Sequence, residues 1–296
     1  MQIALKIKLA LACAAGFAGL IELVPVVLEI SAQDAGLRER QAIVEVPSGS
    51  ASYRVNGEFT SASRQASAPL VQVSMSKPLA IMKHQVSSSD YQLCVDDGGC
   101  RALDRSVVVA HDRPAVQTSW YDAIAYAAWL SRKTGETYRL PTDEEWAFAA
   151  GSKFNDDGIV IDQNDPSKGW IAVYVREADR APSDPGTRSF GSFGTNENGL
   201  QDIGGNVWEW TTSCFVRTVL DDFGKAVSNN SNCGVRIVEG QHRAYLTDFI
   251  RDAKAGGCAV GLPPENLGFR LVVDRQTWLG VPRLVRRAAS QIKALL

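Results

Sequence analysis

The amino-acid sequence predicts a domain of the α+β class, in which short strands and few helices are joined by long loops. Stretches between residues 43 and 82 alternate apolar with polar side chains, as half-buried strands do. Between residues 87 and 146, three serines or threonines are each followed three residues later by an acid, the signature of a capped helix start. From residue 151 to 199 the chain is rich in Gly, Asp, Asn, Ser and Pro, a composition typical of loops.

The first strands are expected on either side of two polar interruptions. Gly49 and Ser50 are predicted to form a turn, and residues 61–67 are predicted to form a loop. The expected strands are residues 43–46, the stretch around Tyr53 and Val55, residues 71–75 and residues 79–82.

Three helices follow, and their starts are predicted from capping residues. The predicted N-caps and their acidic partners are Ser87 with Asp90, Ser119 with Asp122, and Thr142 with Glu145. In the second helix Ile124, Ala127 and Leu130 fall on one face, which predicts that this face is buried. Gly135 is expected to end that helix.

The later part of the chain is expected to complete the domain with strands. Residues 207–212 and 267–273 are expected as strands, and the second closes a domain that spans residues 43–274. The aromatic side chains scattered through residues 151–199 argue that this loop packs against the domain. Residues 275–296 interleave apolar with basic side chains, which predicts a basic amphipathic helix. Either it docks on the domain, or it contacts a membrane surface or a partner.

The composition is that of an ordinary globular protein, with 45% hydrophobic and 22% charged residues in a chain of 296. The 31 basic and 33 acidic residues nearly balance, which leaves a net charge of −2. The overall charge therefore gives no reason to expect a nucleic-acid partner.

Residues 1–32 are predicted to be an export signal or a membrane anchor. Two lysines precede an apolar run from Leu9 to Leu28, in the order of the basic and apolar regions of a signal. Glu22 and Pro25 interrupt the run, and a charge or a proline inside a bilayer disfavours a spanning helix.

Cleavage of this signal is expected after Ala32, which would release the protein into the periplasm or outside the cell. The alternative is an uncleaved anchor in the inner membrane, with the protein facing the periplasm. Residues 33–42 are polar and are expected to form a flexible linker.

Five cysteines lie beyond the predicted signal, and export makes their pairing the default expectation. Cys94 and Cys100 enclose a flexible turn that can close a short loop, and Cys214 can pair with either Cys233 or Cys258. The odd count leaves one thiol over, which would be either reactive or buried and inert.

Three segments of the chain carry specific motifs. They are Val116–Trp146 with Thr-Ser-Trp-Tyr-Asp-Ala and Arg-Leu-Pro-Thr-Asp-Glu-Glu-Trp, Asn198–Trp210 with Asn-Gly-Leu and Gly-Asn-Val-Trp-Glu-Trp, and Asn266–Leu271 with Asn-Leu-Gly-Phe-Arg-Leu. In this order and spacing they resemble the sulfatase-modifying factor family of formylglycine-generating enzymes, over a span from about Ile43 to Val273. The resemblance implies a compact fold like that of C-type lectins, with short twisted sheets, few helices and much ordered loop.

The resemblance also implies a structural calcium ion at the Gly-Asn-Val-Trp-Glu-Trp segment. Asn206 and Glu209 offer hard oxygen ligands, and the carbonyl groups of Gly205 and Val207 are expected nearby. The alternative is that Glu209 pairs with an arginine and Asn206 only caps a turn. Arg270 is expected to be buried against a carboxylate rather than to bind substrate.

In the oxidases of this family, two cysteines bind copper and activate oxygen to convert a substrate cysteine to formylglycine. The corresponding positions here fall near Ala244 and Phe249, within a stretch from residue 239 to 252 that contains no cysteine. Copper is therefore not expected, because Cu(I) prefers soft thiolate ligands. Cys233 and Cys258 flank the stretch, and a structural disulfide is expected if folding brings them together.

Iron is not expected either. The ergothioneine-synthase branch of the family binds iron with a cluster of histidines, whereas His84, His111 and His242 show no close ligand spacing. The catalytic residues, if there are any, are not assigned by the motifs.

The residues that occupy the corresponding cleft region are polar. The candidates are His242, Tyr245, Asp248, Arg251 and Asp252, with Arg243 and Lys254 beside them. Such residues are compatible with a binding groove or with a cofactor-free acid–base site. A surface network of ion pairs is equally compatible with them.

Two functions follow from the resemblance. The first is an exported accessory or maturation protein that binds a partner polypeptide in the groove that the family uses for extended peptides, without making formylglycine. A link to the maturation of periplasmic copper nitrite reductases rests on analogy. The alternative is a periplasmic oxidase similar to the pyoverdine-maturation members, in which carboxylate and tyrosine groups of residues 242–252 act on a protein or a small molecule.

Overall fold

The computed structural model describes residues 36–37, 41–104, 107–155, 165, 167–168, 171, 175, 186–251 and 266–274. The chain divides into two units between Ser31 and Ala32, and all described residues belong to the second unit. The predicted signal, most of the linker, Asp252, Lys254, Cys258 and the predicted C-terminal helix lie outside the described residues. No helix within the described ranges is long and apolar enough to cross a membrane.

The strands of the described part form three sheets. The first has the order β1 (Ile43–Val46), β6 (Leu79–Met82), β12 (Val272–Val273) and β7 (Tyr138–Arg139). The second has the order β10 (Ala244–Thr247), β9 (Ala226–Glu239), β8 (Trp208–Leu220), β3 (Glu58–Ser61) and β4 (Arg64–Ala66), and β11 (Leu267–Gly268) pairs with β8. The third pairs β2 (Gly49–Arg54) with β5 (Leu70–Met75). Together with the few helices, this confirms the α+β class.

The helices begin at the predicted capping residues. They are α2 (Ser88–Asp96), α3 (Trp120–Thr134) and α4 (Asp143–Ala150), and a short 3-10 turn, η1 (Gly151–Lys153), follows α4. Ser87, Ser119 and Thr142 are their N-caps, and the last two form complete capping boxes with the acids three residues on. Gly135 ends α3 with a φ of 71°, a left-handed conformation that glycine adopts without steric cost.

Two turn and loop predictions near the N-terminal end of the domain are wrong. Gly49 and Ser50 lie inside β2, because they pair with Met75 and Ser74 of β5. Residues 61–67 contain the tight hairpin between β3 and β4 rather than a loop. Ala62 and Ser63 turn this hairpin with φ values of 46° and 64°, and non-glycine residues rarely adopt such angles. Neither residue type signals a turn of that kind.

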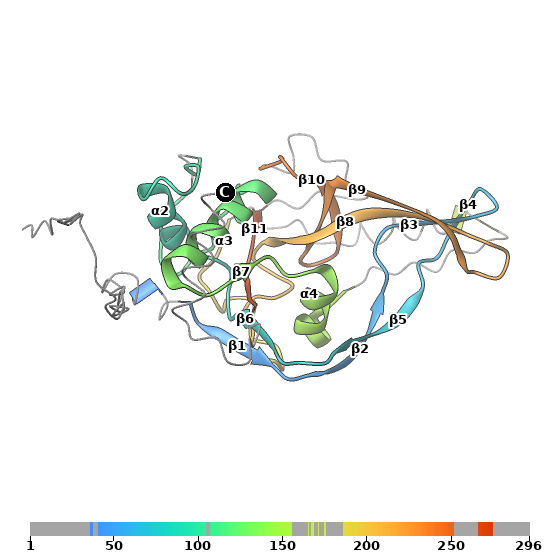
Figure 1. Cartoon of the computed structure of the whole chain (residues 1–296), viewed down its shortest axis with the longest axis horizontal. Coiled ribbons are helices and arrows are strands. Elements are labelled where there is room, and N and C mark those ends of the chain that lie inside the picture. Colours follow the sequence, from blue (N-terminus) through green and yellow to red (C-terminus); the bar gives the residue numbers. More distant parts are fainter. Residues whose placement is uncertain are drawn as a thin grey trace, which may run out of the picture. The chain divides into compact units, whose positions relative to one another are not determined.

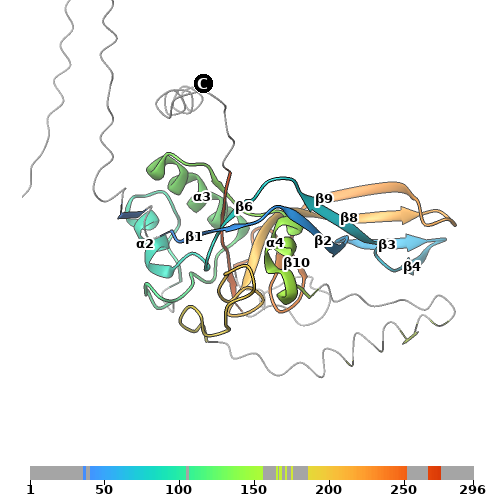
Figure 2. The ribbon, with the colours of Figure 1, turned by 90° about the horizontal axis from the view of Figure 1, so that it is seen from below.

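The hairpin of β8 and β9 is the longest feature of the second sheet (Figure 1). The predicted strand at residues 207–212 is only its beginning, because β8 continues to Leu220. Figure 2 shows β3 and β4 alongside the far part of the hairpin, where β3 runs parallel to residues 217–220 of β8. The predicted strand at residues 267–273 is two strands, β11 and β12, which join different sheets.

The main core lies between α3 and the base of this hairpin. Tyr126, Leu130, Trp210 and Phe269 are fully buried in one apolar cluster. The predicted apolar face of α3 is therefore confirmed at Ala127 and Leu130, although Ile124 is only partly buried. Burial of such side chains contributes about 1.5–3 kcal/mol each, so this core fixes the base of the hairpin against α3.

Candidate functional site

The strand that carries the Gly-Asn-Val-Trp-Glu-Trp motif is held by a buried ion pair. Arg270 donates from Nε to Oε2 of Glu209 at 2.6 Å and from Nη2 to Oε1 at 2.7 Å, and both side chains are fully buried. Gln85 and Trp146 donate to the same carboxylate, at 2.7 Å and 2.9 Å. Arg270 is thus buried against a carboxylate, as the sequence predicts.

The groups that were expected to bind calcium have other partners in this structure. The side-chain amide of Asn206 exchanges two hydrogen bonds with the backbone of Arg188, at 3.0 Å and 2.9 Å. The carbonyl of Gly205 accepts a hydrogen bond from Val207 N at 2.7 Å. Because Arg270 already neutralises the carboxylate of Glu209, this donor set does not fit a calcium ion as arranged here. The arrangement is the alternative in which Glu209 pairs with an arginine and Asn206 fixes a turn.

Ala244 and Phe249, near which the sequence places the two catalytic cysteine positions of the family, differ in their surroundings. Ala244 begins β10, is 1% exposed and pairs with Val238. Phe249 follows β10 and is 68% exposed. Neither side chain carries a metal-ligating atom, so the residues at these positions do not fit a copper ion.

The described candidates, His242, Tyr245, Asp248 and Arg251, contact different parts of the domain. His242 is buried against the ring of Trp208, and its Nδ1 lies 2.9 Å from the carbonyl of Arg243. Tyr245 points toward Gly57, whose N–H donates to its hydroxyl at 2.9 Å. Burial raises the pKa of Tyr245 above its ordinary value. His242 and Tyr245 therefore make contacts within the fold, to the ring of Trp208 and to the backbone at Arg243 and Gly57.

Arg243 belongs to a buried ionic cluster, which we define as Tyr53, Asp143, Glu239 and Arg243. Its Nε donates to Glu239 Oε1 at 2.7 Å, and its Nη2 lies 3.3 Å from Asp143 Oδ2. The hydroxyl of Tyr53 donates to Asp143, and the guanidinium lies over the ring of Tyr53. Asp143 is the first residue of α4, so the cluster links this helix to β2, β9 and the start of β10.

Two carboxylates share one arginine in this cluster, and that arrangement shifts the pKa of Glu239. Burial raises the pKa of Glu239 well above its ordinary value, and the neighbouring charge of Asp143 raises it further. Burial opposes the charged form of Arg243, but Asp143 and Glu239 outweigh it and its pKa is raised. The cluster therefore favours holding a proton on Glu239.

Asp248 and Arg251 instead reach the start of α3. Tyr121 donates from its hydroxyl to Asp248 Oδ2 at 2.8 Å, and this hydrogen bond raises the pKa of Tyr121. The guanidinium of Arg251 lies 2.9 Å from Asp122, the acid of the α3 capping box. One ion pair with a buried carboxylate and one tyrosine–carboxylate hydrogen bond therefore join the end of β10 to the start of α3.

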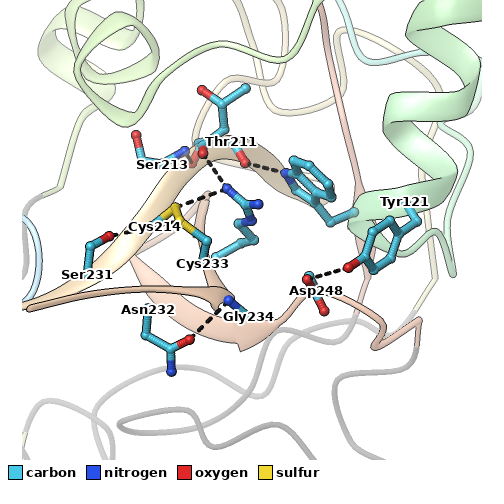
Figure 3. The surroundings of a disulfide bond; sticks show 12 residues. Tyr121, Thr211, Ser213, Cys214, Ser231, Asn232, Cys233, Gly234 and Asp248 are labelled. Carbon is cyan, nitrogen blue, oxygen red and sulfur yellow. Dashed lines mark hydrogen bonds between the residues drawn. A yellow bond between two sulfur atoms is a disulfide. The ribbon is translucent and has the colours of Figure 1, made fainter.

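Arg236 of β9 completes what we call the outer cluster, namely Trp120, Tyr121, Arg236 and Asp248. Its guanidinium lies 4.0 Å from the centre of the Trp120 ring, and its Nη1 donates to the carbonyl of Thr212 at 2.8 Å. Trp120 itself donates from Nε1 to the carbonyl of Thr211 at 3.0 Å. The outer cluster meets the Cys214–Cys233 disulfide through Arg236, whose Nη1 lies 3.1 Å from Sγ of Cys214. Figure 3 shows the hydrogen bond between Tyr121 and Asp248 in the same surroundings.

Both predicted disulfides are confirmed for the described cysteines. Cys94 pairs with Cys100 and Cys214 pairs with Cys233, whereas Cys258 lies outside the described residues. The alternative pairings of Cys258 with Cys214 or Cys233 are therefore contradicted.

Sequence reasoning missed several residues of these clusters. Asp143, Glu239 and Arg236 come from separate strands and helices, and no local spacing indicates that they meet. Trp120 and Tyr121 belong to the Thr-Ser-Trp-Tyr-Asp-Ala motif, and membership in that motif is the sequence feature that could have indicated their role. Within the described residues, no group of three His, Cys, Asp or Glu side chains is arranged to hold a metal ion.

The family described as the Sulfatase-modifying factor enzyme 1-like domain matches residues 30–275. A formylglycine-generating enzyme of Mycobacterium tuberculosis is 36% identical over 117 residues, which are 38% of this chain and 37% of that protein. A protein of Bos taurus named inactive C-alpha-formylglycine-generating enzyme 2 is 32% identical over 169 residues, which are 53% of this chain and 49% of that protein.

The chain thus spans about a third to a half of the length of these curated relatives. Among solved structures, PvdO from Pseudomonas aeruginosa aligns with a TM-score of 0.49 and 21% identity, over 78% of this chain and 93% of that chain.

Proposed function

Because the chain belongs to the Sulfatase-modifying factor enzyme 1-like family, we propose that it is an accessory or maturation protein that binds a partner polypeptide without producing formylglycine. The observation that carries the proposal is that residues 239–252, the stretch that corresponds to the catalytic segment, contain no cysteine. A buried methyl group at Ala244 and an exposed aromatic ring at Phe249 stand near the two positions. Neither can supply the thiolates that copper-dependent oxidation requires.

The surface around Phe249 supports binding. Tyr121 is 56% exposed and donates to Asp248, the residue before Phe249. Exposed aromatic rings next to a charged group are the side chains that dominate many protein interfaces, because they bury large areas at little entropic cost. An extended peptide that crosses this surface would meet both rings and the carboxylate of Asp248.

Site-specific crosslinking tests where the partner binds. A photoreactive amino acid replaces Phe249, and the protein is irradiated in the periplasm of the producing bacterium. We expect one discrete crosslinked polypeptide, identified by mass spectrometry.

The matched control carries the same photoreactive residue at Phe223, which is 95% exposed at the tip of the β8–β9 hairpin. We expect this position to give no adduct of that size. Equal patterns at the two positions, or no adduct at Phe249, would contradict a binding surface around the outer cluster.

Export is a further part of the proposal, and its support is the predicted signal at residues 1–32. We expect the protein in the periplasmic fraction, with a new N-terminus after Ala32. Full-length protein retained in the inner membrane would favour the anchor.

Sedimentation with vesicles of anionic lipid, with and without residues 275–296, tests membrane contact of the predicted basic helix.

A role in the maturation of periplasmic copper nitrite reductases is the most specific form of the proposal, and its support is analogy within the family. Deletion of the gene is then expected to lower nitrite reductase activity in the periplasm, and complementation is expected to restore it. Unchanged activity after deletion would remove this process from the proposal.

The alternative function is oxidation at a site without cysteines, and the contact between Tyr121 and Asp248 favours it. A tyrosine hydroxyl that donates to a carboxylate is an acid–base pair, and Tyr121 is accessible to a substrate. Elemental analysis of the purified protein separates the two functions. Iron or copper at near-unit stoichiometry would favour the oxidase, whereas we expect neither metal at that level.

A further inference from the structure

The Cys214–Cys233 disulfide lies at an irregularity of the β8–β9 ladder. Cys214 is paired with Arg236, but the next residue of β8, Phe215, is paired with Asn232. The strand β9 therefore bulges here, because its residues 233–235 lie between the partners of two consecutive residues of β8. Irregularities of this kind turn backbone and side chains out of a ladder and are over-represented next to reactive sites.

The two sulfur atoms of this disulfide have different surroundings. Cys233 lies in the bulged segment and is exposed, whereas Cys214 is half-buried in β8. A thiol that approaches from solvent therefore reaches Sγ of Cys233 first. Attack on one sulfur expels the other, so Cys214 would be the leaving group.

A guanidinium group is positioned to stabilise that leaving group. Nη1 of Arg236 donates to Sγ of Cys214 at 3.1 Å. The stacking on Trp120 and the hydrogen bond to Thr212 hold the guanidinium in place. A neighbouring arginine lowers the pKa of a cysteine thiol, and a leaving thiol of low pKa departs faster. The other charged or titratable groups that act on Arg236 are Asp248 and Tyr121.

The second disulfide of the protein provides an internal comparison. Cys94 is fully buried in the main core, and Cys100 packs against the same core. A Cβ atom added at Gly99 would lie 3.2 Å from Sγ of Cys94 and 2.8 Å from the ring of Trp129, so backbone and an aromatic ring pack closely around this sulfur. Burial and the apolar surroundings are expected to protect this disulfide from thiols.

We propose that Cys214–Cys233 is a site of thiol–disulfide exchange for a thiol-bearing substrate. The substrate thiolate attacks Sγ of Cys233, the Cys233–Cys214 bond breaks, and Cys214 leaves as a thiolate beside Arg236. The product is a mixed disulfide between the substrate and Cys233. A second thiolate of the substrate then attacks the substrate sulfur of the mixed disulfide and releases the Cys233 thiolate. The substrate dithiol is thereby oxidised to a disulfide, and Cys214 and Cys233 are reduced.

The test follows the reaction of the purified, oxidised protein with 2-mercaptoethanol, a small neutral thiol. Samples are quenched by alkylation, and each cysteine is quantified by mass spectrometry of peptides. We expect the adduct on Cys233 and alkylation on Cys214, while Cys94 and Cys100 stay paired. A peptide with two cysteines is the second probe, and we expect it to be recovered with an internal disulfide.

The variant Arg236→Gln tests the role of the guanidinium. We expect it to slow opening of Cys214–Cys233 about three- to tenfold, because the rate falls about threefold for each unit by which the leaving-group pKa rises. Arg236→Lys is expected to retain part of the rate. Arg217→Gln is the matched control on the same hairpin, where Arg217 pairs with Glu58 at 2.8 Å, and its rate is expected to equal that of the wild type.

Three results would overturn the proposal. The first is that 2-mercaptoethanol opens the two disulfides at equal rates. The second is an adduct on Cys214 in place of Cys233. The third is that Cys214–Cys233 opens equally fast in Arg236→Gln and Arg217→Gln. The stability of Cys94–Cys100 in each variant shows that the fold is intact. The proposal is independent of partner binding at Phe249, so either can fail without the other.

Discussion

Glu209 is the residue at which three distant parts of the chain meet. Gln85, Trp146 and Arg270 all donate to its carboxylate, and none of the four groups is reached by water. Two charges removed from water cost several kcal/mol in desolvation, which only good geometry and further hydrogen bonds offset. The pair is therefore sensitive to the loss of one partner.

The variant Glu209→Gln tests this sensitivity. It leaves the guanidinium of Arg270 buried without a counter-charge, so we expect the free energy of unfolding to fall by about 3–5 kcal/mol. Urea denaturation measures it. The double variant Glu209→Gln with Arg270→Met is expected to be more stable than Glu209→Gln alone, because it removes the unpaired charge. A loss below about 1 kcal/mol for the single variant would contradict a buried ion pair.

The titration of Glu239 predicts a pH dependence of stability. Its pKa is raised in the folded protein, so the protonated carboxyl stabilises the fold fully below the ordinary pKa of the group. That contribution is lost as the pH rises through the folded pKa, and each tenfold difference in proton affinity between the folded and unfolded protein corresponds to about 1.4 kcal/mol. Glu239→Gln keeps an oxygen that accepts from Arg243 and does not titrate. We expect its stability relative to the wild type to increase between pH 4 and pH 8.

Urea denaturation at a series of pH values measures this difference. Glu58→Gln is the control, because the side chain of Glu58 is 41% exposed in a surface pair with Arg217. If the free energies of unfolding of Glu239→Gln and the wild type differed by the same amount at every pH, Glu239 would hold no extra proton in the folded protein.

At the scale of single residues, the sequence predicts partners well only where a motif specifies them. The burial of Arg270 against a carboxylate follows from the Gly-Phe-Arg motif, and the structure confirms it. The contact of Arg243 with Asp143 joins residues a hundred positions apart, and no spacing encodes it. Such contacts depend on how the elements pack, which residue patterns do not determine.

Among the elements, the three capped helices are the part of the fold that local sequence predicts most directly. A serine or threonine hydroxyl accepts a backbone N–H of the first turn, and that interaction involves only four consecutive residues. In α4 the hydroxyl of Thr142 accepts from Glu145 N at 3.1 Å, and Glu145 accepts from Thr142 N at 2.8 Å.

Thr142→Ala removes the hydroxyl half of this capping box. We expect the free energy of unfolding to fall by about 1 kcal/mol, and Thr142→Ser, which retains the hydroxyl, to stay close to the wild type. Thermal or urea unfolding of the three proteins measures it. Equal losses for the two variants would show that the methyl group of Thr142, and not the cap, is responsible.

Removal of metal tests the calcium ion that the resemblance implies for the motif strand of β8. Because Arg270 occupies the carboxylate of Glu209, we expect the Tm to be unchanged by a calcium chelator and by added calcium. A fall in Tm that calcium reverses, and that Glu209→Gln abolishes, would show that an ion replaces the contacts described for Asn206 and Glu209.

Strand boundaries are the part of the elements that the sequence does not predict. The hairpin of β3 and β4 turns at Ala62 and Ser63, residues with no preference for positive φ. The extension of β8 to Leu220 is stabilised by β9 and β3 on either side, so its length depends on partners from other parts of the chain.

For the whole molecule, the order of three motifs predicts the family and the α+β class, and the family match over residues 30–275 confirms both. The candidate site was predicted less well, because residues that are close in sequence around β10 diverge in the structure. Arg243 enters the buried ionic cluster, whereas Asp248 belongs to the outer cluster. The alternation of side chains along a strand sends neighbours to opposite faces, which a list of polar residues does not reveal.

The central claim is that this member of the family does not convert cysteine to formylglycine. The direct measurement is mass spectrometry of a Cys-x-Pro-x-Arg peptide after incubation with the purified protein, oxygen and added copper, alongside an active formylglycine-generating enzyme. We predict that the peptide keeps its cysteine with this protein and loses it with the active enzyme. Formylglycine in the first reaction, above the level found without protein, would contradict the claim.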